Sequence, residues 1–145
     1  MSIYPTKLAE LSEMLSTLSE QDRIEMLLDF SSKYIEVSAE IAKPPYPEEN
    51  KAPFCESNVY VWSNLDLEGK IRFHFAVENP QGLSARALTV ILGNTLAGES
   101  PESIINIPSN IITNIFSENL SIRKNLGLTS ILQRVQAEAK KYLKE

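Results

Sequence analysis

The chain holds one cysteine, Cys55, and one histidine, His74, so the chemistry open to its side chains is narrow. A single thiol forms no intramolecular disulfide, and it cannot build a zinc site that needs several thiolates. A lone cysteine can still act as a nucleophile or exchange sulfur, provided that it is accessible and partly ionised. Cys55 is therefore the first candidate for a catalytic residue.

Cys55 stands between a proline-rich segment and a predicted strand. Residues 43–54 contain four prolines, Pro44, Pro45, Pro47 and Pro53. Proline lacks a backbone donor and disfavours helix, which predicts an extended loop. Loops carry functional residues more often than regular elements do. Lys51 would favour the thiolate and Glu56 would oppose it, so the residues alone leave open both a reactive thiol and an inert, buried one.

A second interpretation is a cysteine hydrolase in which His74 activates Cys55 and a carboxylate orients the histidine. The competing interpretation of His74 is an exposed histidine on the polar face of a strand. No His-x-x-x-His spacing and no glycine-rich phosphate loop occur in the sequence. We therefore expect no metal ion and no cofactor.

The composition excludes several other classes of function. The 145 residues carry a formal net charge of −5, so there is no basic excess to displace the counterions of a nucleic acid. The N-terminus lacks a basic segment followed by an apolar one, and no apolar run reaches the ~18 residues that span a membrane. We expect a cytoplasmic protein, a monomer or weak dimer, with neither nucleic acid nor membrane as a partner.

Hydrophobic periodicity predicts an α+β fold in a single domain, residues 1–145. Alternating residues predict a β-hairpin with strands over 57–65 and 70–78, within a small antiparallel sheet of two to three strands. Helices are predicted over residues 5–17, 19–40, 83–97, 100–107, 109–117 and 129–143. The first two should form a helical hairpin that buries one stripe of the second helix, including Ile24 and Leu28.

The residues around the cysteine resemble the SufE/CsdE family of sulfur-acceptor proteins. The family motif reads approximately N-K-V-x-G-C-x-S-x-V-W, and five residues match it here: Asn50, Lys51, Cys55, Ser57 and Val59. The order of elements is also alike. The segment S-A-R-A-L at 84–88 stands where the family has a helix with a basic residue, and S-P-E-S-I-I at 100–105 corresponds to T-P-x-x-I-V.

The resemblance implies that Cys55 accepts sulfane sulfur as a persulfide from a PLP-dependent cysteine desulfurase of the SufS/CsdA type. It implies that the chain stimulates that enzyme and passes the sulfur to a scaffold for iron–sulfur clusters. Four further residues are expected to support the cysteine loop or to contact the partner: Lys51, Ser57, Arg86 and Arg123. Arg123 is the best match to a family arginine associated with desulfurase docking.

Two departures from the family pattern motivate an alternative. Phe54 replaces the glycine that precedes the family cysteine, and a phenyl side chain forbids backbone conformations that glycine allows. The family segment L-T-P-S-R-x-N-G is represented by L-S-I-R-K-N-L-G at 120–127. The alternative is a divergent paralogue that binds and regulates a desulfurase or scaffold without transferring sulfur.

Overall fold

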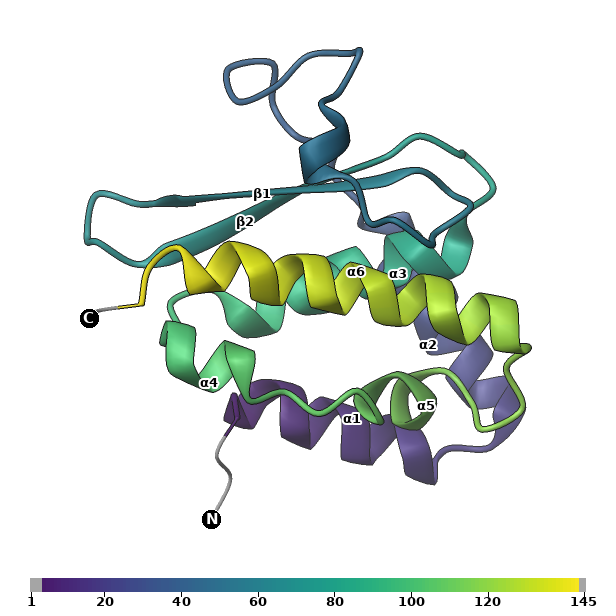
Figure 1. The fold of residues 1–145 in the computed structure, drawn as a ribbon. Helices are drawn as coiled ribbons and strands as arrows, with labels where there is room; N and C mark the ends of the chain where they lie inside the picture. Colours follow the sequence, from purple (N-terminus) through teal and green to yellow (C-terminus); the bar gives the residue numbers. More distant parts are fainter. Residues whose placement is uncertain (1–3, 144–145) are drawn as a thin grey trace.

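The computed structural model describes residues 4–143 and has an α+β architecture, as predicted (Figure 1). The described chain contains six α-helices, one short 3-10 helix and two strands. In chain order these are α1 (Thr6–Thr17), α2 (Glu20–Ser32), η1 (Glu48–Asn50), β1 (Val59–Leu65), β2 (Ile71–Val77), α3 (Leu83–Leu96), α4 (Pro101–Ile105), α5 (Ile111–Ile115) and α6 (Ile122–Lys140). None of the described helices is long and apolar enough to cross a membrane.

Serine side chains fix where three of the helices begin. Ser19 accepts a hydrogen bond from the N–H of Asp22, and Ser121 accepts one from the N–H of Lys124, each at 3.1 Å. Ser100 caps α4 in the same way and is followed by a proline at the first helical position. Each cap satisfies a donor that the first helical turn leaves unpaired.

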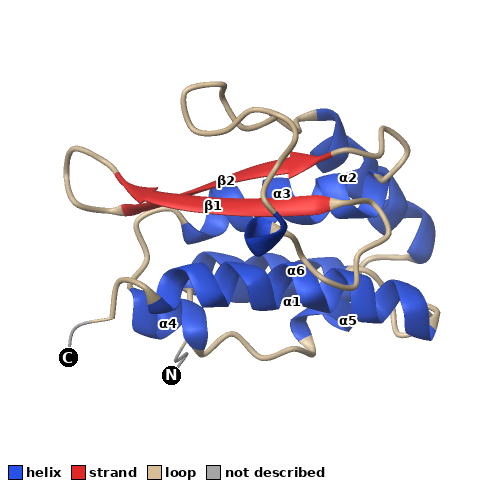
Figure 2. Ribbon diagram, turned by 45° about the horizontal axis from the view of Figure 1, so that its top comes forward, coloured by secondary structure: helices blue, strands red, loops and turns tan. Residues whose placement is uncertain are grey.

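The two strands form the predicted hairpin, with Val59 opposite Val77 and Leu65 opposite Ile71. One face of the sheet packs on α3 and α6, as Figure 2 shows from above. The other face is covered by the loop that follows α2, where Tyr46 lies against the ring of Tyr60. Both faces of this small sheet are therefore covered over much of its length.

The buried cluster beneath the sheet lies between the two strands and helices α1, α3, α4, α5 and α6. Its largest fully buried side chains are Leu8, Leu15, Leu88, Ile91, Leu92, Leu96, Ile104, Ile111, Ile112, Ile115, Ile131 and Leu132. A buried carboxylate ties α6 to the sheet. Glu138, only 2% exposed, accepts hydrogen bonds from Ser63 at 2.7 Å and Arg134 at 2.7 Å, and pairs with Lys141 at 2.8 Å.

The second helix is shorter than predicted, since it ends at Ser32 and not near residue 40. The residues that follow are held along the edge of β2. The N–H of Val37 donates to the carbonyl of Phe75 at 2.8 Å, and the hydroxyl of Tyr34 accepts from the N–H of Val77 at 2.8 Å. These contacts with the sheet edge replace the helical hydrogen bonds that the periodicity predicted.

The packing of the N-terminal helices also differs from the prediction. Both helices are present, but α1 packs against α3 and α5, while α2 packs against α3, and neither makes its main contacts with the other. The stripe expected to be buried on α2 is divided: Ser31 is buried, whereas Ile24 and Leu28 are about half exposed. An apolar strip of α2 therefore remains at the surface.

The last helix begins seven residues earlier than predicted, at Ile122 and not at residue 129. The segment that was expected to be a loop forms the first two turns of α6, with Gly127 inside the helix. The Ser121 cap and the close packing of Gly127 explain the early start. Residues 121–128 are thereby placed beside the cysteine.

Candidate functional site

Cys55 lies in a turn that projects from the start of β1. The N–H of Ala52 donates to the carbonyl of Val59 at 2.8 Å, and the N–H of Cys55 donates to the carbonyl of Ala52 at 3.4 Å. The N–H of Asn58 then donates to the carbonyl of Cys55 at 3.2 Å, with a φ of 53° at Asn58. Asparagine tolerates this left-handed conformation better than most residues. The backbone thus reverses around the thiol.

A buried side chain anchors the start of this turn. The amide of Asn50 donates to the carbonyl of Val61 at 2.9 Å. Asn50 is 9% exposed, so this hydrogen bond is largely shielded from water. It joins the end of η1 to the outer edge of β1, which fixes the proline-rich segment just before the cysteine.

Two glycines let neighbouring elements approach the turn closely. A Cβ at Gly82 would lie 2.6 Å from Oγ of Ser57, and a Cβ at Gly127 would lie 3.1 Å from the carbonyl oxygen of Phe54 and 3.3 Å from Cα of Cys55. Any larger residue would displace the turn or the helix. These glycines seat the turn between the start of α3 and the second turn of α6.

A pocket of about 330 Å³ opens beside the thiol. Three segments far apart in the sequence contribute to its lining, within residues 55–57, 79–85 and 121–128. The first turns of both α3 and α6 are among them. Unpaired N–H groups give a helix N-terminus a partial positive charge, so two such termini favour an anion in this pocket.

Two basic residues of α6 line the same pocket, Arg123 and Lys124. Arg123 pairs with Glu56, the residue after the cysteine, at 3.1 Å, and both side chains are largely exposed. An exposed pair contributes little to stability, about 0–1 kcal/mol. Its position matters more, because it links α6 to the cysteine turn at the mouth of the pocket.

Cys55 is partly buried, and this burial raises the pKa of its thiol above the ordinary value. Hydrogen bonds from the backbone and the hydroxyl of Ser57 oppose the rise, while the carboxylate of Glu56 adds to it. The net direction is upward, so the resting thiol is mainly protonated at neutral pH. Lys51, which was expected to favour the thiolate, is not among the groups that shift the pKa of Cys55.

The four supporting residues predicted from the sequence divide into two pairs. Ser57 and Arg123 line the pocket with Cys55. Lys51 does not line it and forms a backbone bridge with Tyr60. Arg86 does not line it either: its guanidinium lies 4.4 Å from the centre of the Tyr34 ring and donates to the carbonyl of Val77 at 3.3 Å.

Arg86 therefore contacts the end of β2 and not the thiol. The residues just beyond that strand hold the cysteine turn, since the N–H of Glu78 donates to the carbonyl of Asn58 and the N–H of Asn79 donates to the carbonyl of Ser57, each at 3.2 Å. Support of the cysteine loop by Arg86 through this strand end stays a prediction.

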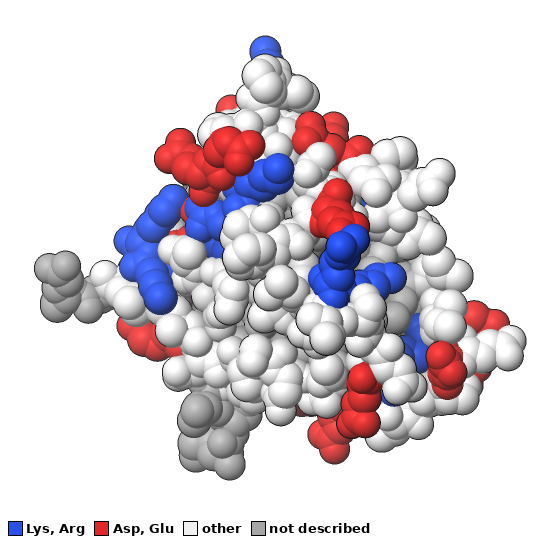
Figure 3. Space-filling view, turned by 45° about the vertical axis from the view of Figure 1, so that its right-hand side comes forward, with Lys and Arg blue, Asp and Glu red and all other residues white. Residues whose placement is uncertain are grey.

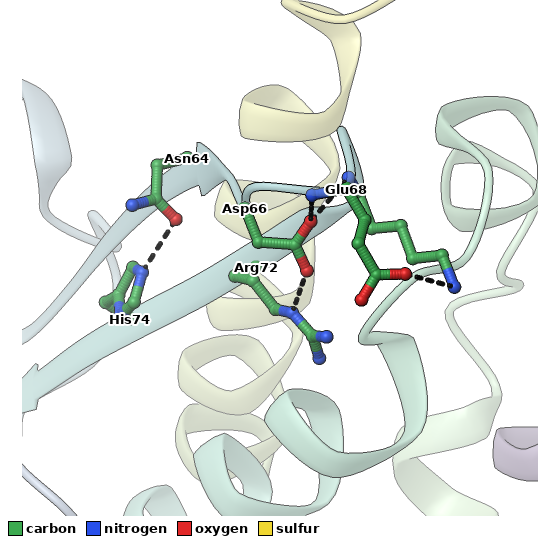
Figure 4. A network of polar contacts seen from close by, with 6 residues as sticks. Asn64, Asp66, Glu68, Arg72 and His74 are labelled. Carbon is green, nitrogen blue, oxygen red and sulfur yellow. Dashed lines mark hydrogen bonds and ion pairs between the residues drawn. The ribbon is translucent and has the colours of Figure 1, made fainter.

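His74 does not join Cys55. Its side chain lies on the hairpin, where Nε2 is 3.0 Å from Oδ1 of Asn64 (Figure 4). The residue opposite His74 across the sheet is Trp62, three positions from the end of β1 that adjoins the cysteine turn. Burial lowers the pKa of His74. The arrangement that a cysteine hydrolase would need is not formed.

Several pocket residues were not predicted from the sequence, namely Gly82, Ser84, Lys124 and Gly127. The N-P-Q-G turn at 79–82 and the glycine at 127 were visible signals, but nothing local indicated that they meet at the cysteine. Among the described residues, no group of three or more His, Cys, Asp or Glu side chains is placed to hold a metal ion.

The comparisons with known proteins concern the family and the fold of the chain. The family model of the SufE Fe-S metabolism associated domain matches residues 9–139. A cysteine desulfuration protein SufE of Plasmodium vivax is 35% identical over 96 residues, which is 65% of this chain and 39% of that protein. The chain thus matches well under half the length of this relative.

A solved structure has a closely similar fold. It is the solution structure of a hypothetical protein from Thermus thermophilus, with a TM-score of 0.72 and 26% sequence identity. The match covers 95% of this chain and 96% of that one. The family match over most of the sequence confirms the resemblance noted above: the chain belongs to the SufE family of Fe-S metabolism associated domains.

Proposed function

We propose that Cys55 accepts sulfane sulfur from the persulfide of a PLP-dependent cysteine desulfurase and passes it on for iron–sulfur cluster assembly. The observation that carries this proposal is the position of the chain's one thiol, on the wall of a pocket that the positive ends of two helices share. Family membership supports the same chemistry.

The transfer is an exchange at sulfur that needs no outside oxidant or reductant. The thiolate of Cys55 attacks the terminal sulfur of the donor persulfide. A sulfur–sulfur bond to Cys55 forms as the donor's sulfur–sulfur bond breaks, and the donor cysteine leaves as a thiolate. The proton on the terminal sulfur stays with it, so Cys55 ends as a persulfide and no net electrons are transferred.

The electrostatics of the site suit a thiol that is protected at rest. Burial keeps the Cys55 thiol mainly protonated, which slows its reaction with oxidants. The hydrogen bonds of Ser57 and the two helix termini favour an anion once the pocket is occupied. Sulfur acceptance should therefore rise with pH toward the raised pKa of the thiol.

The proposal is tested by incubating the protein with a cysteine desulfurase and free cysteine. Intact-mass spectrometry should detect one added sulfur, about 32 Da, that a reductant removes. The matched variant Cys55→Ser should gain no mass. If the wild-type protein also gains none, Cys55 is not a sulfur acceptor.

The regulatory alternative predicts a different pattern in the same experiment. Desulfurase turnover would be stimulated or inhibited equally by the wild-type protein and by Cys55→Ser, with no adduct on either. Stimulation that disappears in Cys55→Ser supports transfer, because the enzyme then depends on the thiol to remove its persulfide. Alanine and persulfide should be measured together, so that turnover and loading are compared directly.

A further inference from the structure

A second hollow adjoins the Cys55 pocket. Its volume is about 290 Å³, and α2 contributes Ile24, Leu27 and Leu28 to its lining. The residues common to both hollows are Gln81, Leu83, Ser84 and Lys124. Because these four residues line both, the surface runs continuously from the thiol to the exposed strip of α2. We call this second hollow the α2 groove.

The walls of the α2 groove are aliphatic and incompletely covered. Ile24 is 49% exposed, Leu28 47% and Leu83 48%. Single exposed apolar residues are ordinary on protein surfaces, but several that line one concave surface are typical of an interaction site. Helix α2 carries more apolar residues than its contact with α3 can bury, so some of them remain at the surface.

A basic residue stands where the two hollows meet. Lys124 lines both, and it forms no ion pair with any other residue of the described chain, whereas its neighbour Arg123 is paired with Glu56. Figure 3 brings forward the side of the molecule on which α3 and α6 begin. Charged side chains form small groups there, separated by broad uncharged surface. An occupant of this groove should therefore be mainly apolar, with a carboxylate that reaches Lys124.

We propose that the α2 groove is the docking surface for the sulfur donor. The proposal rests on the proposed function of Cys55. A desulfurase that delivers sulfur must cover the mouth of the Cys55 pocket, and the groove continues that mouth without a break. The donor places aliphatic side chains between Ile24, Leu28 and Leu83 and a carboxylate beside Lys124, while its persulfide enters the pocket.

The test measures binding and loading separately. Leu28→Gln and Ile24→Gln replace half-exposed aliphatic side chains, and Lys124→Glu reverses the charge at the junction. Each should weaken binding of the desulfurase about tenfold or more, as calorimetric titration would measure. Leu67→Gln is the matched control, because Leu67 is fully exposed in the hairpin turn and distant in sequence from the groove. It should bind as the wild type does.

Loading by inorganic polysulfide gives the readout that does not depend on docking. Leu28→Gln and Ile24→Gln, which lie outside the Cys55 pocket, should gain sulfur on Cys55 from polysulfide at the wild-type rate, and their thermal unfolding should match that of Leu67→Gln. Lys124→Glu changes a residue of the Cys55 pocket, so it is judged by its binding of the desulfurase alone. The proposal is supported if a variant loads Cys55 from polysulfide normally but requires about tenfold more desulfurase to reach the same rate of sulfur transfer. If the variants change the self-association of the protein and leave desulfurase binding unchanged, the groove binds a second copy of the chain and the proposal is overturned.

The two proposals fail in distinguishable ways. If wild-type protein receives sulfur from the desulfurase and all three groove variants bind and receive it equally well, the docking surface lies elsewhere and the function of Cys55 stands. If wild-type protein receives no sulfur, the function itself is wrong. Loss of folding in one variant is detected by its unfolding curve, and Lys124→Glu, at an exposed position, then decides the question.

Discussion

Replacing Gly127 by alanine should move the cysteine turn and not the helix. A Cβ at residue 127 would lie 3.1 Å from the carbonyl oxygen of Phe54, about 0.3 Å inside ordinary van der Waals contact. It would also lie 3.3 Å from Cα of Cys55. Alanine favours helix over glycine by about 1 kcal/mol, so α6 itself gains from the substitution.

The turn is the weaker side of this contact. Its hydrogen bond from the N–H of Cys55 to the carbonyl of Ala52 is long, at 3.4 Å, and a typical hydrogen bond contributes only about 1 kcal/mol. The gain in helix propensity and the strain on the turn should nearly cancel. We expect the free energy of unfolding of Gly127→Ala to stay within about 1 kcal/mol of the wild type.

The pKa and the reactivity of the Cys55 thiol should nevertheless change. A displaced turn exposes Cys55 and relieves the burial that raises its pKa, so the pKa should fall and alkylation by iodoacetamide should become faster at neutral pH. The assay is the alkylation rate between about pH 6 and pH 10, beside urea unfolding. Gly93→Ala is the matched control, because its Cβ would meet only Phe75 at an ordinary 3.7 Å. If both glycine variants give the wild-type pH profile, the turn does not rest on Gly127.

Three further outcomes are expected. Ser57→Ala removes a hydrogen bond that lowers the pKa of Cys55, so the alkylation midpoint should move to higher pH. Burial alone would raise the pKa of Glu138, but its hydrogen bonds and cationic neighbours hold that pKa below the usual range. The wild type should therefore lose stability as the pH falls through this lowered pKa. Glu138→Gln should be less stable than the wild type by about 2 kcal/mol near pH 7, and its stability should not show this loss at low pH. Asn50→Ala leaves the carbonyl of Val61 unpaired and should cost about 1–3 kcal/mol in urea unfolding.

The hairpin could be predicted from the sequence because its signals are local. Ile71, Phe75 and Val77 alternate with polar or smaller residues and are buried, as the period-two pattern indicates. Asp66 and Gly69 then form the turn, where the carboxylate of Asp66 accepts from two backbone N–H groups. Each of these features depends on neighbours within a few positions.

The predicted end of α2 and the predicted start of α6 were wrong because tertiary contacts override the local sequence pattern there. The periodicity of α2 continues past Ser32, but the free edge of β2 binds residues 34–37 and ends the helix. Residues 122–128 look like a loop, yet the cap at Ser121 and packing on the cysteine turn make them helical. Neither the sheet edge nor the cysteine turn is near these segments in the sequence.

The candidate site also has one part that the sequence predicts and one part that it does not. Cys55 could be singled out because it is unique and follows a proline-rich segment, and Ser57 accompanies it in the motif. The pocket could not be predicted, because its other walls are brought to Cys55 by the packing of α3 and α6. The resemblance supplied the position of the cysteine but not the surface around it.

The assembly of this pocket from three distant segments makes Cys55 a reporter of the state of the whole chain. Its shielding requires residues 55–57, 79–85 and 121–128 to be in place together, and these contacts close long loops. In a chain that has not finished folding, the thiol would titrate as in a short peptide and would react with any electrophile. Pulse alkylation during refolding or synthesis should therefore mark unfinished molecules and spare mature ones.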